Sequence, residues 1–176
     1  MSFGWEGEKI RLVPLDIEKH LANAIKWMND PEVTAWLLVG DFPISELSER
    51  EYFDRMMKSN DSEVAFAMET LSGKHIGFSG LHKIDWRNGY ATSGTVIGAK
   101  EEWGRGYGKD AARTRAQYAF EVLGLRMILS EVIDGNDRSL RMQQAVGYKV
   151  YGRVPRKVWK RGAYRDLILT YLERPE

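Results

Sequence analysis

The segment 97–111, with the sequence IGAKEEWGRGYGKDA, constrains the fold of this chain more than any other. It has the pattern of a strand end, a loop with three alternate glycines and a helix start; the glycines are Gly104, Gly106 and Gly108. Such a loop lets backbone amides approach a ligand closely, and the helix adds unpaired N–H groups at the positive end of its dipole. With Arg105 and Lys109 beside these amides, the segment is predicted to bind a pyrophosphate or a similar anion. A plain strand-to-helix turn is the alternative.

Two common phosphate-binding motifs do not fit this segment. A Walker A loop requires Ser or Thr after its lysine, but Asp110 follows Lys109, and Trp103 occupies the position of its first glycine. The dinucleotide fingerprint requires G-x-G-x-x-G after an early strand, whereas this chain has G-R-G-Y-G more than halfway along. The remaining interpretation is a loop for the pyrophosphate of coenzyme A (CoA).

The chain has 176 residues, which fits one domain spanning residues 1–176, and it contains no cysteine. The missing thiols exclude a disulfide framework, a thiolate metal site and a cysteine nucleophile, and we expect no metal centre. A net charge of +1 is too balanced for a general nucleic-acid binder. The longest apolar stretch, residues 35–39, is far shorter than the roughly 20 residues of a membrane span, and residues 1–10 lack a signal-peptide pattern. We therefore expect a soluble cytoplasmic protein with no membrane or nucleic-acid partner.

The order of the predicted elements indicates a mixed sheet. Strands are expected at 8–15, 64–70, 76–84, 91–99, 127–133, 148–154 and 167–172, with a basic turn between the last two. Helices are expected at 16–28, 45–58, 109–123 and 137–146, with a short helix or turn at 32–39. A meander of strands followed by β-α-β crossovers requires both antiparallel and parallel pairs.

Two motifs and the order of the elements resemble the GNAT acyltransferases, which are N-acetyltransferases that use acetyl-CoA. The run WGRGYG at 103–108 is similar to the family loop [Q/R]-x-x-G-x-[G/A], with Trp103 where Gln or Arg is usual. Asn136 opens NDRSLRMQQAVGY, which is similar to the family pattern N-x-x-[S/A]-x-x-x-Y-x-x-x-G-[F/Y]. Residues 156–172 resemble the closing hairpin of the branch that contains ribosomal-protein N-terminal and spermidine acetyltransferases. The resemblance spans residues 8–173.

The resemblance implies an α/β fold of the mixed α+β type: the GNAT acyl-CoA N-acyltransferase fold, a central mixed, mostly antiparallel sheet flanked by helices. It also implies direct acetyl transfer from acetyl-CoA to a primary amine. Ile97 and Gly98 would pair with the pantetheine arm, and Asn136 would bond to it or help orient the thioester. Ser139 would cap the following helix near the cofactor. The pyrophosphate would be held by the amides of Trp103, Gly104, Arg105, Gly106, Tyr107 and Gly108, with Lys109 beside them.

The usual catalytic groups of the family are missing from this sequence. Gln143 stands where a Tyr often serves as the acid; it donates a hydrogen bond but gives up no proton, and Thr92 stands where related enzymes often have Glu. His82 is the candidate base, because its phase along the strand points it to an apolar face, although a structural core histidine is the alternative. Two aromatic residues that could reach the thiolate, or could be core residues, are Tyr148 and Tyr151.

The two halves of the chain carry opposite charge. Residues 1–72 contain 7 basic and 14 acidic side chains, and residues 73–176 contain 19 basic and 11 acidic ones. Since the first helices form the acceptor side in GNAT enzymes, we expect a cationic small molecule, a polyamine or a peptide N-terminus as acceptor, although solvated helix faces explain the same charges. The acidic residues concerned are Asp41, Glu46, Glu49, Glu51 and Asp54. The nine basic residues from 138 to 165 are expected to face the phosphates of CoA.

Two other functions remain open at this stage. The missing Tyr and Glu are compatible with a degenerate acetyltransferase that only senses CoA. The basic 138–165 face is compatible with a ribosome- or RNA-binding module. A second copy of the chain, forming a homodimer, is a further candidate partner.

Overall fold

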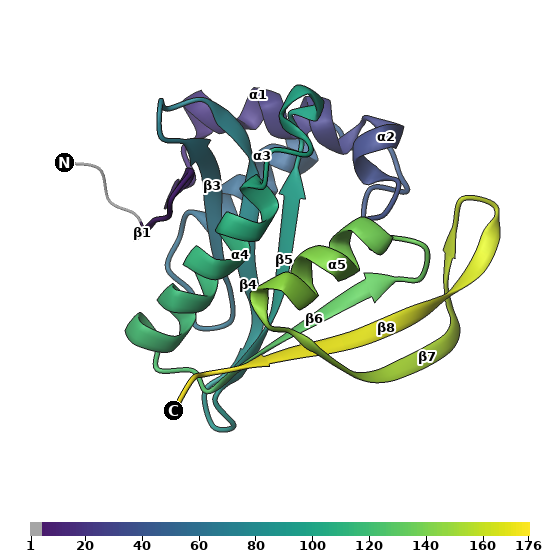
Figure 1. Ribbon diagram of the computed structural model, residues 1–176. Coiled ribbons are helices and arrows are strands. Elements are labelled where there is room, and N and C mark those ends of the chain that lie inside the picture. The colour runs from purple at the N-terminus through teal and green to yellow at the C-terminus, as the bar shows by residue number, and fades with distance from the viewer. Residues whose placement is uncertain (1–4) are drawn as a thin grey trace.

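The computed structural model describes residues 5–176, in which eight strands form one sheet in the order β1-β2-β3-β4-β5-β6-β8-β7 (Figure 1). The strands are β1 (Trp5–Glu6), β2 (Ile10–Pro14), β3 (Val64–Thr70), β4 (His75–Asp85), β5 (Tyr90–Ile97), β6 (Met127–Ile133), β7 (Lys149–Lys160) and β8 (Ala163–Glu173). The helices are α1 (Ile17–Met28), α2 (Pro31–Thr34), α3 (Glu46–Met56), α4 (Tyr107–Gln117) and α5 (Asp137–Val146). Every strand pair is antiparallel except β5 with β6. The expected mixed, mostly antiparallel sheet flanked by helices is therefore confirmed.

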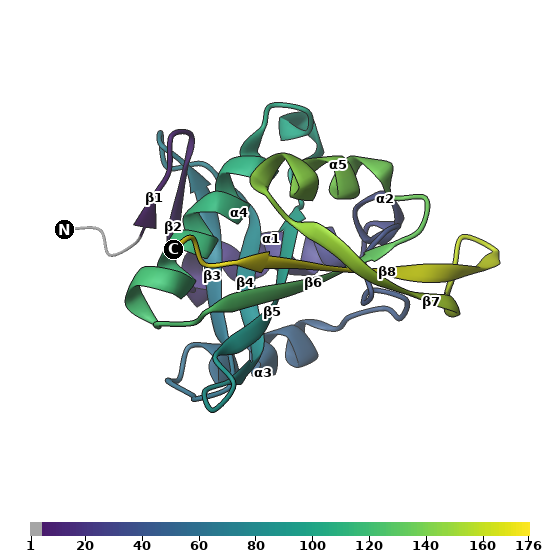
Figure 2. The ribbon, with the colours of Figure 1, turned by 60° about the horizontal axis from the view of Figure 1, so that its bottom comes forward.

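The helices cover the two faces of the sheet separately, as Figure 2 shows, with α4 and α5 on one face and α3 on the other. On the α1/α3 face, Leu21 and Phe53 form a buried cluster with Ala67 of β3, and Phe78 of β4 packs against it. On the α4 face, Ala116 packs with Leu81 of β4 and with other apolar residues. Because side chains alternate along a strand, Phe78, Gly80 and His82 in the regular part of β4 lie on the α3 face, whereas Ser79 and Leu81 lie on the α4 face.

The sheet is split where its one parallel pair begins. β5 pairs with β6 only through Tyr90–Thr92, which lie beside Met127–Leu129. Over the rest of its length β5 keeps β4 as a neighbour, but residues 93–97 are not paired with β6, which is reached only by the Ser93 hydroxyl donating to the Leu129 carbonyl. Figure 1 shows β5 and β6 diverging from this point. The result is an open strand edge that starts at the middle of the sheet and ends at the glycine loop.

The closing hairpin is longer than the sequence predicts. The segment expected to be a basic turn between 154 and 167 is mostly strand, and the turn itself is reduced to Arg161 and Gly162, at φ +53° and +75°. Two residues at positive φ are typical of the tight hairpin turns that match strand twist. A register shift between Val154 and Val158 accommodates Pro155, which has no N–H to donate to a ladder. The sequence prediction failed here because the proline and the charges suggested a loop.

Helix starts follow the sequence signals with one difference. Asp16 caps α1 as predicted, through a bond from the Lys19 amide. Ser45, where the helix 45–58 is expected to begin, caps α3 by accepting a hydrogen bond from the Ser48 amide. In α5 the cap is Asn136, whose side chain accepts from the Ser139 amide, and Ser139 is therefore the capped residue and not the cap. Among the described residues no helix is long and apolar enough to cross a membrane.

The half-buried His75 makes the contact between α1 and the start of β4 sensitive to acid. The His75 ring packs against His20 with centroids 4.5 Å apart, and its Nδ1 lies 3.0 Å from the side-chain nitrogen of Asn23. Burial, followed by the neighbouring His20, lowers the pKa of His75 to about 4. His75 is therefore neutral in the folded protein at neutral pH.

We expect the free energy of unfolding to fall by about 2 kcal/mol as the pH falls from 6.5 to 4, after allowing for partial exposure of the His75 ring. The unfolded chain takes up a proton near pH 6.5, whereas the folded ring resists until about pH 4, so acid favours the unfolded state. Urea unfolding across this range measures the loss. His75→Gln is the control, because it removes the titrating group; an equal loss in this variant would contradict the assignment.

Candidate active site

The phosphate loop has the backbone shape that its glycines predict. Gly104 and Gly106 adopt φ of +81° and +85°, and Gly106 is the residue that precedes α4. No side chain caps this helix start. A Cβ atom at Gly104 would meet no atom within 4 Å, so the space above this residue is open. The loop is thus shaped to present its backbone outward.

The amides of the phosphate loop are free to bind a ligand. Trp103 N–H donates to the Lys100 carbonyl, 3.1 Å away, and is occupied. Among residues 5–176, no acceptor is recorded for the six amides that follow, from Gly104 to Lys109. Six consecutive free N–H groups at the positive end of a helix form a binding site for an anion such as a pyrophosphate.

Two residues outside the predicted motif complete this site. The Lys9 ammonium donates to the Arg105 carbonyl at 2.9 Å, which adds a third cation to Arg105 and Lys109 at the loop. Asp110 holds the backbone near Lys9, because its carboxylate accepts hydrogen bonds from the amides of Glu8, Lys9 and Ile10. A recess of about 430 Å³ lies beside the loop, and Lys9, Arg105 and Tyr107 line it with three residues from the β3–β4 turn. The sequence offers no signal that connects residue 9 with this loop.

The loop is tied to the end of β5 and to α5 by the Trp103 side chain. Its indole N–H donates to the Ile97 carbonyl at 2.8 Å, and the Arg138 guanidinium lies 5.5 Å from the centre of its ring. The backbone of Gly98 packs directly against the Trp27 side chain, because an added Cβ would lie 1.9 Å from the indole. The Gly98 amide donates to the Ile76 carbonyl, so this amide is engaged within the sheet. Ile97 therefore borders the open edge of β5, and Gly98 packs behind it.

The two residues proposed for catalysis lie on opposite faces of the sheet. Gln143 is buried in α5, where its amide nitrogen donates to Ser130 at 2.8 Å and its oxygen accepts from Thr170 at 2.6 Å. Both of its polar groups are thus paired within the β6–β8 layer. His82 is in phase with Phe78 and faces the α3 side, where its Nδ1 lies 3.4 Å from a carboxylate oxygen of Glu63. Its side chain is 35% exposed, so His82 does not point into a closed apolar core.

The surface around His82 includes two positions without side chains and carries negative charge. Gly80 and Gly94 are paired on adjacent strands, and Cβ atoms there would lie 3.2 and 3.9 Å from His82 Nε2. The imidazole therefore lies over a floor without side chains, next to the open part of β5. On α3, burial and then the charges of Glu63 and Glu49 raise the pKa of Tyr52.

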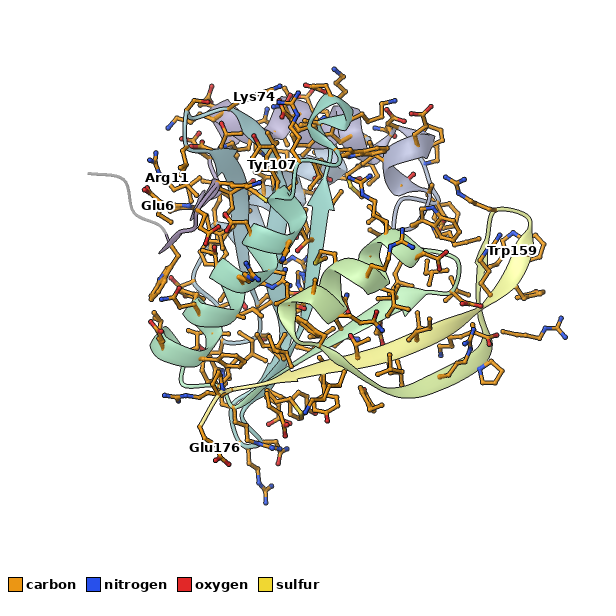
Figure 3. The ribbon with its side chains drawn as sticks, in the orientation of Figure 1. Glu6, Arg11, Lys74, Tyr107, Trp159 and Glu176 are labelled. Atoms are coloured by element: carbon orange, nitrogen blue, oxygen red, sulfur yellow. The ribbon has the colours of Figure 1, made fainter. Side chains whose placement is uncertain are left out.

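Charge pairs modify two of the sequence expectations. Asp41, expected to attract the acceptor, forms an ion pair with the buried Lys160, and Glu46 pairs with Arg50 on α3. In the hairpin, Arg161 and Arg165 lie over the Trp36 ring at 5.0 and 5.1 Å. In Figure 3, Trp159 marks this hairpin, well away from Tyr107 at the start of α4. Arg161 and Arg165 therefore pack on Trp36, in the segment after α2, and do not face the phosphate loop.

The two tyrosines considered for the leaving thiolate are placed differently. Tyr148 is buried, with its hydroxyl 3.5 Å from Ser93 Oγ, where β5 and β6 separate. Tyr151 is exposed on β7 beside Tyr171. Within the described residues, no group of three His, Asp or Glu side chains is arranged to hold a metal ion.

Comparisons with known proteins agree with this geometry. Residues 9–149 match the family model of the acetyltransferase (GNAT) domain. The chain is 30% identical over 170 residues to the Bacillus subtilis "Putative ribosomal N-acetyltransferase YdaF", covering 95% of this chain and 91% of that protein. Among solved structures, the spermidine N-acetyltransferase from Vibrio cholerae, in complex with CoA and spermine, superposes with a TM-score of 0.85 at 21% identity, over 93% of this chain and 95% of that one.

The match to the family model includes the free amides of the phosphate loop, the open edge of β5 and the Asn136 cap. Since it extends over most of the chain, this protein belongs to the GNAT family of N-acetyltransferases, whose co-substrate is acetyl-CoA.

Proposed function

We propose that this chain transfers the acetyl group of acetyl-CoA directly to a primary amine of a cationic small molecule, a polyamine or a peptide N-terminus. The observation that carries the proposal is that the loop with the six free amides, at 104–109, closely follows the end of β5 whose edge is not paired with β6. Together they offer an anion site and an extended backbone, which suit the two ends of a phosphopantetheine chain. Without cysteine, the chain has no thiol to carry the acetyl group between the two substrates.

In this proposal the cofactor residues divide into three groups. The phosphate loop binds the pyrophosphate through the amides of Gly104, Arg105, Gly106, Tyr107, Gly108 and Lys109, with the Trp103 ring bracing the loop. Ile97 and Gly98 form the end of the strand along which the pantetheine arm lies. Asn136 and Ser139 start α5 on the other side of the opening, and no partner is recorded for the Asn136 side-chain nitrogen among the described residues.

His82 is the proposed general base, and Glu63 orients it. If Nδ1–H points to the Glu63 carboxylate, the Nε2 lone pair faces the Gly80–Gly94 floor, where an amine reaches it from the α3 side. The amine nitrogen forms a bond with the carbonyl carbon, the carbon–sulfur bond breaks, and its electron pair leaves with sulfur. The amine reacts in its neutral form, after its ammonium proton has passed to water, and the proton that its nitrogen loses as the amide forms passes to His82 Nε2. Because β5 and β6 pair only through Tyr90–Thr92, no β6 backbone is paired with β5 beyond Thr92, between the face of this base and the face of the phosphate loop.

The charge beside His82 favours a cationic acceptor. Glu63 is close enough to His82 and to Tyr52 to attract a protonated amine before it loses its proton. The Vibrio cholerae neighbour was solved with spermine, a polyamine, which supports this acceptor class. Turnover with spermine, spermidine and short peptides that differ in N-terminal residue would discriminate among the three acceptor types.

We expect Gly104→Glu to weaken acetyl-CoA binding at least about tenfold, which corresponds to about 1.4 kcal/mol. The new side chain enters the open space above the loop and brings a carboxylate toward the pyrophosphate. Gly124→Glu is the matched control, because Gly124 also has positive φ and open space around it but lies beyond the far end of α4. Calorimetric titration of acetyl-CoA measures both variants. Equal binding in the two variants, or no binding to the native chain, would contradict the proposed cofactor site.

A further inference from the structure

Arg115 is a buried cation for which the fold provides no carboxylate. It lies on α4 with 3% of its surface exposed, and it appears in no ion pair within residues 5–176. Its Nε is buried and has no hydrogen-bond acceptor. Removing a guanidinium from water without an anionic partner is costly, so a lone buried arginine indicates a missing negative group.

The contacts of Arg115 direct its charge to the open part of β5. Nη1 donates to the Gly94 carbonyl at 2.8 Å, to Ser79 Oγ at 2.8 Å and to Thr95 Oγ1. Gly94 and Thr95 belong to the stretch of β5 that has no partner in β6. All recorded hydrogen bonds of this side chain are made by Nη1, so within the described residues the donors on Nη2 are also without a recorded acceptor.

The distance from the phosphate loop matches the reach of an extended arm. Arg115 lies eight residues beyond Tyr107, which is about 12 Å along the helix. Thr95 lies three residues before Gly98, which is about 10 Å along β5. Following either α4 or β5 from the phosphate loop therefore arrives at the contact between Arg115 and Thr95. An arm that starts at the free amides and follows β5 brings its sulfur end close to Arg115, before the strands join at Thr92.

We propose that Arg115 stabilises the negative charge that develops on the CoA sulfur when the carbon–sulfur bond breaks. This inference rests on the acetyl transfer proposed above. The bond's electron pair stays on sulfur, the guanidinium remains protonated throughout, and the thiolate takes its proton from water after it leaves. A fixed charge thereby does what a proton donor would do at the position of Gln143, whose polar groups are paired with Ser130 and Thr170.

The test is the ionisation of CoA bound to the native enzyme. The chain contains no cysteine, so the CoA sulfur is the only thiol in the sample and its thiolate absorbance is read without interference from the protein's own thiols. The reference is the complex with desulfo-CoA, which cancels the tyrosine signal. We expect the thiol of bound CoA to ionise at least tenfold more readily than that of free CoA. Arg115→Met should abolish this difference and lower kcat about a hundredfold.

Two variants separate charge from structure. Thr95→Val removes one hydrogen bond of Arg115 but keeps the guanidinium, and it should retain the shifted ionisation. Arg115→Lys keeps a cation and should retain part of the shift even if Arg115→Met does not fold. Ionisation of bound CoA equal to that of free CoA in the native enzyme, or equal in the native enzyme and Arg115→Met, would overturn the inference. A native chain that binds no CoA would instead refute the proposed function.

Discussion

Replacing His82 with alanine is expected to lower kcat/KM for amine acetylation by about a thousandfold, within the range for loss of a general base. The amine must lose a proton as its nitrogen forms the new bond, and His82 is the imidazole that borders the open part of β5. The affinity for acetyl-CoA should stay within about threefold of the native value, because the phosphate loop lies at the start of α4, on the other face of the sheet. Steady-state kinetics and calorimetry on the same preparations measure both quantities.

Two further measurements distinguish a base from a structural histidine. Glu63→Gln removes the negative partner but keeps a hydrogen-bond acceptor, so a loss of about tenfold is expected, much smaller than for His82→Ala. Added imidazole should restore part of the activity of His82→Ala, because the Gly80–Gly94 floor leaves room for the free ring. Retention of full activity in His82→Ala would exclude the base, and a loss without rescue and with lower thermal stability would indicate a packing role.

The phosphate loop was predictable because its signal is local. Alternate glycines, a following helix and nearby cations fall within a dozen residues, and their backbone shape follows from glycine chemistry. The contact of Lys9 with the loop was not predictable, since it joins residues 96 positions apart through the pairing of β2 with the rest of the sheet. Single-sequence patterns carry no information on which distant segments meet.

The catalytic side was less predictable for a different reason. Alternation along β4 predicts which face of the sheet carries His82, but it does not predict what covers that face. In the structure His82 lies next to Gly80 and Gly94, and its side chain is partly exposed. The spacing after Asn136 predicts a catalytic position for Gln143, but the structure shows that its amide is hydrogen-bonded to Ser130 of β6 and Thr170 of β8. The sequence does not distinguish Arg115 from any other arginine on a helix, because its burial depends on the tertiary fold.

The largest effect on stability is expected from Asp110→Ala, at about 3–5 kcal/mol, which lowers the melting temperature by roughly 10 °C. This carboxylate is 7% exposed and accepts the amides of three consecutive residues, Glu8, Lys9 and Ile10. Its removal leaves those N–H groups without an acceptor at the junction of β2 and α4. Because the same residues position the Lys9 ammonium at the phosphate loop, we also expect weaker acetyl-CoA binding in this variant.

Asp137→Ala is the matched control for a general helix-end effect. Asp137 also lies in the first turn of a helix, but it is exposed and accepts no hydrogen bond recorded among the described residues. Its loss should cost no more than about 0.5–1 kcal/mol, the usual value of an acidic residue at the positive end of a helix dipole. Asp110→Asn should fall between the two, because an amide oxygen still accepts hydrogen bonds but carries no charge. Equal destabilisation by Asp110→Ala and Asp137→Ala in thermal and urea unfolding would mean that the dipole, and not the three bonds across the fold, explains the role of Asp110.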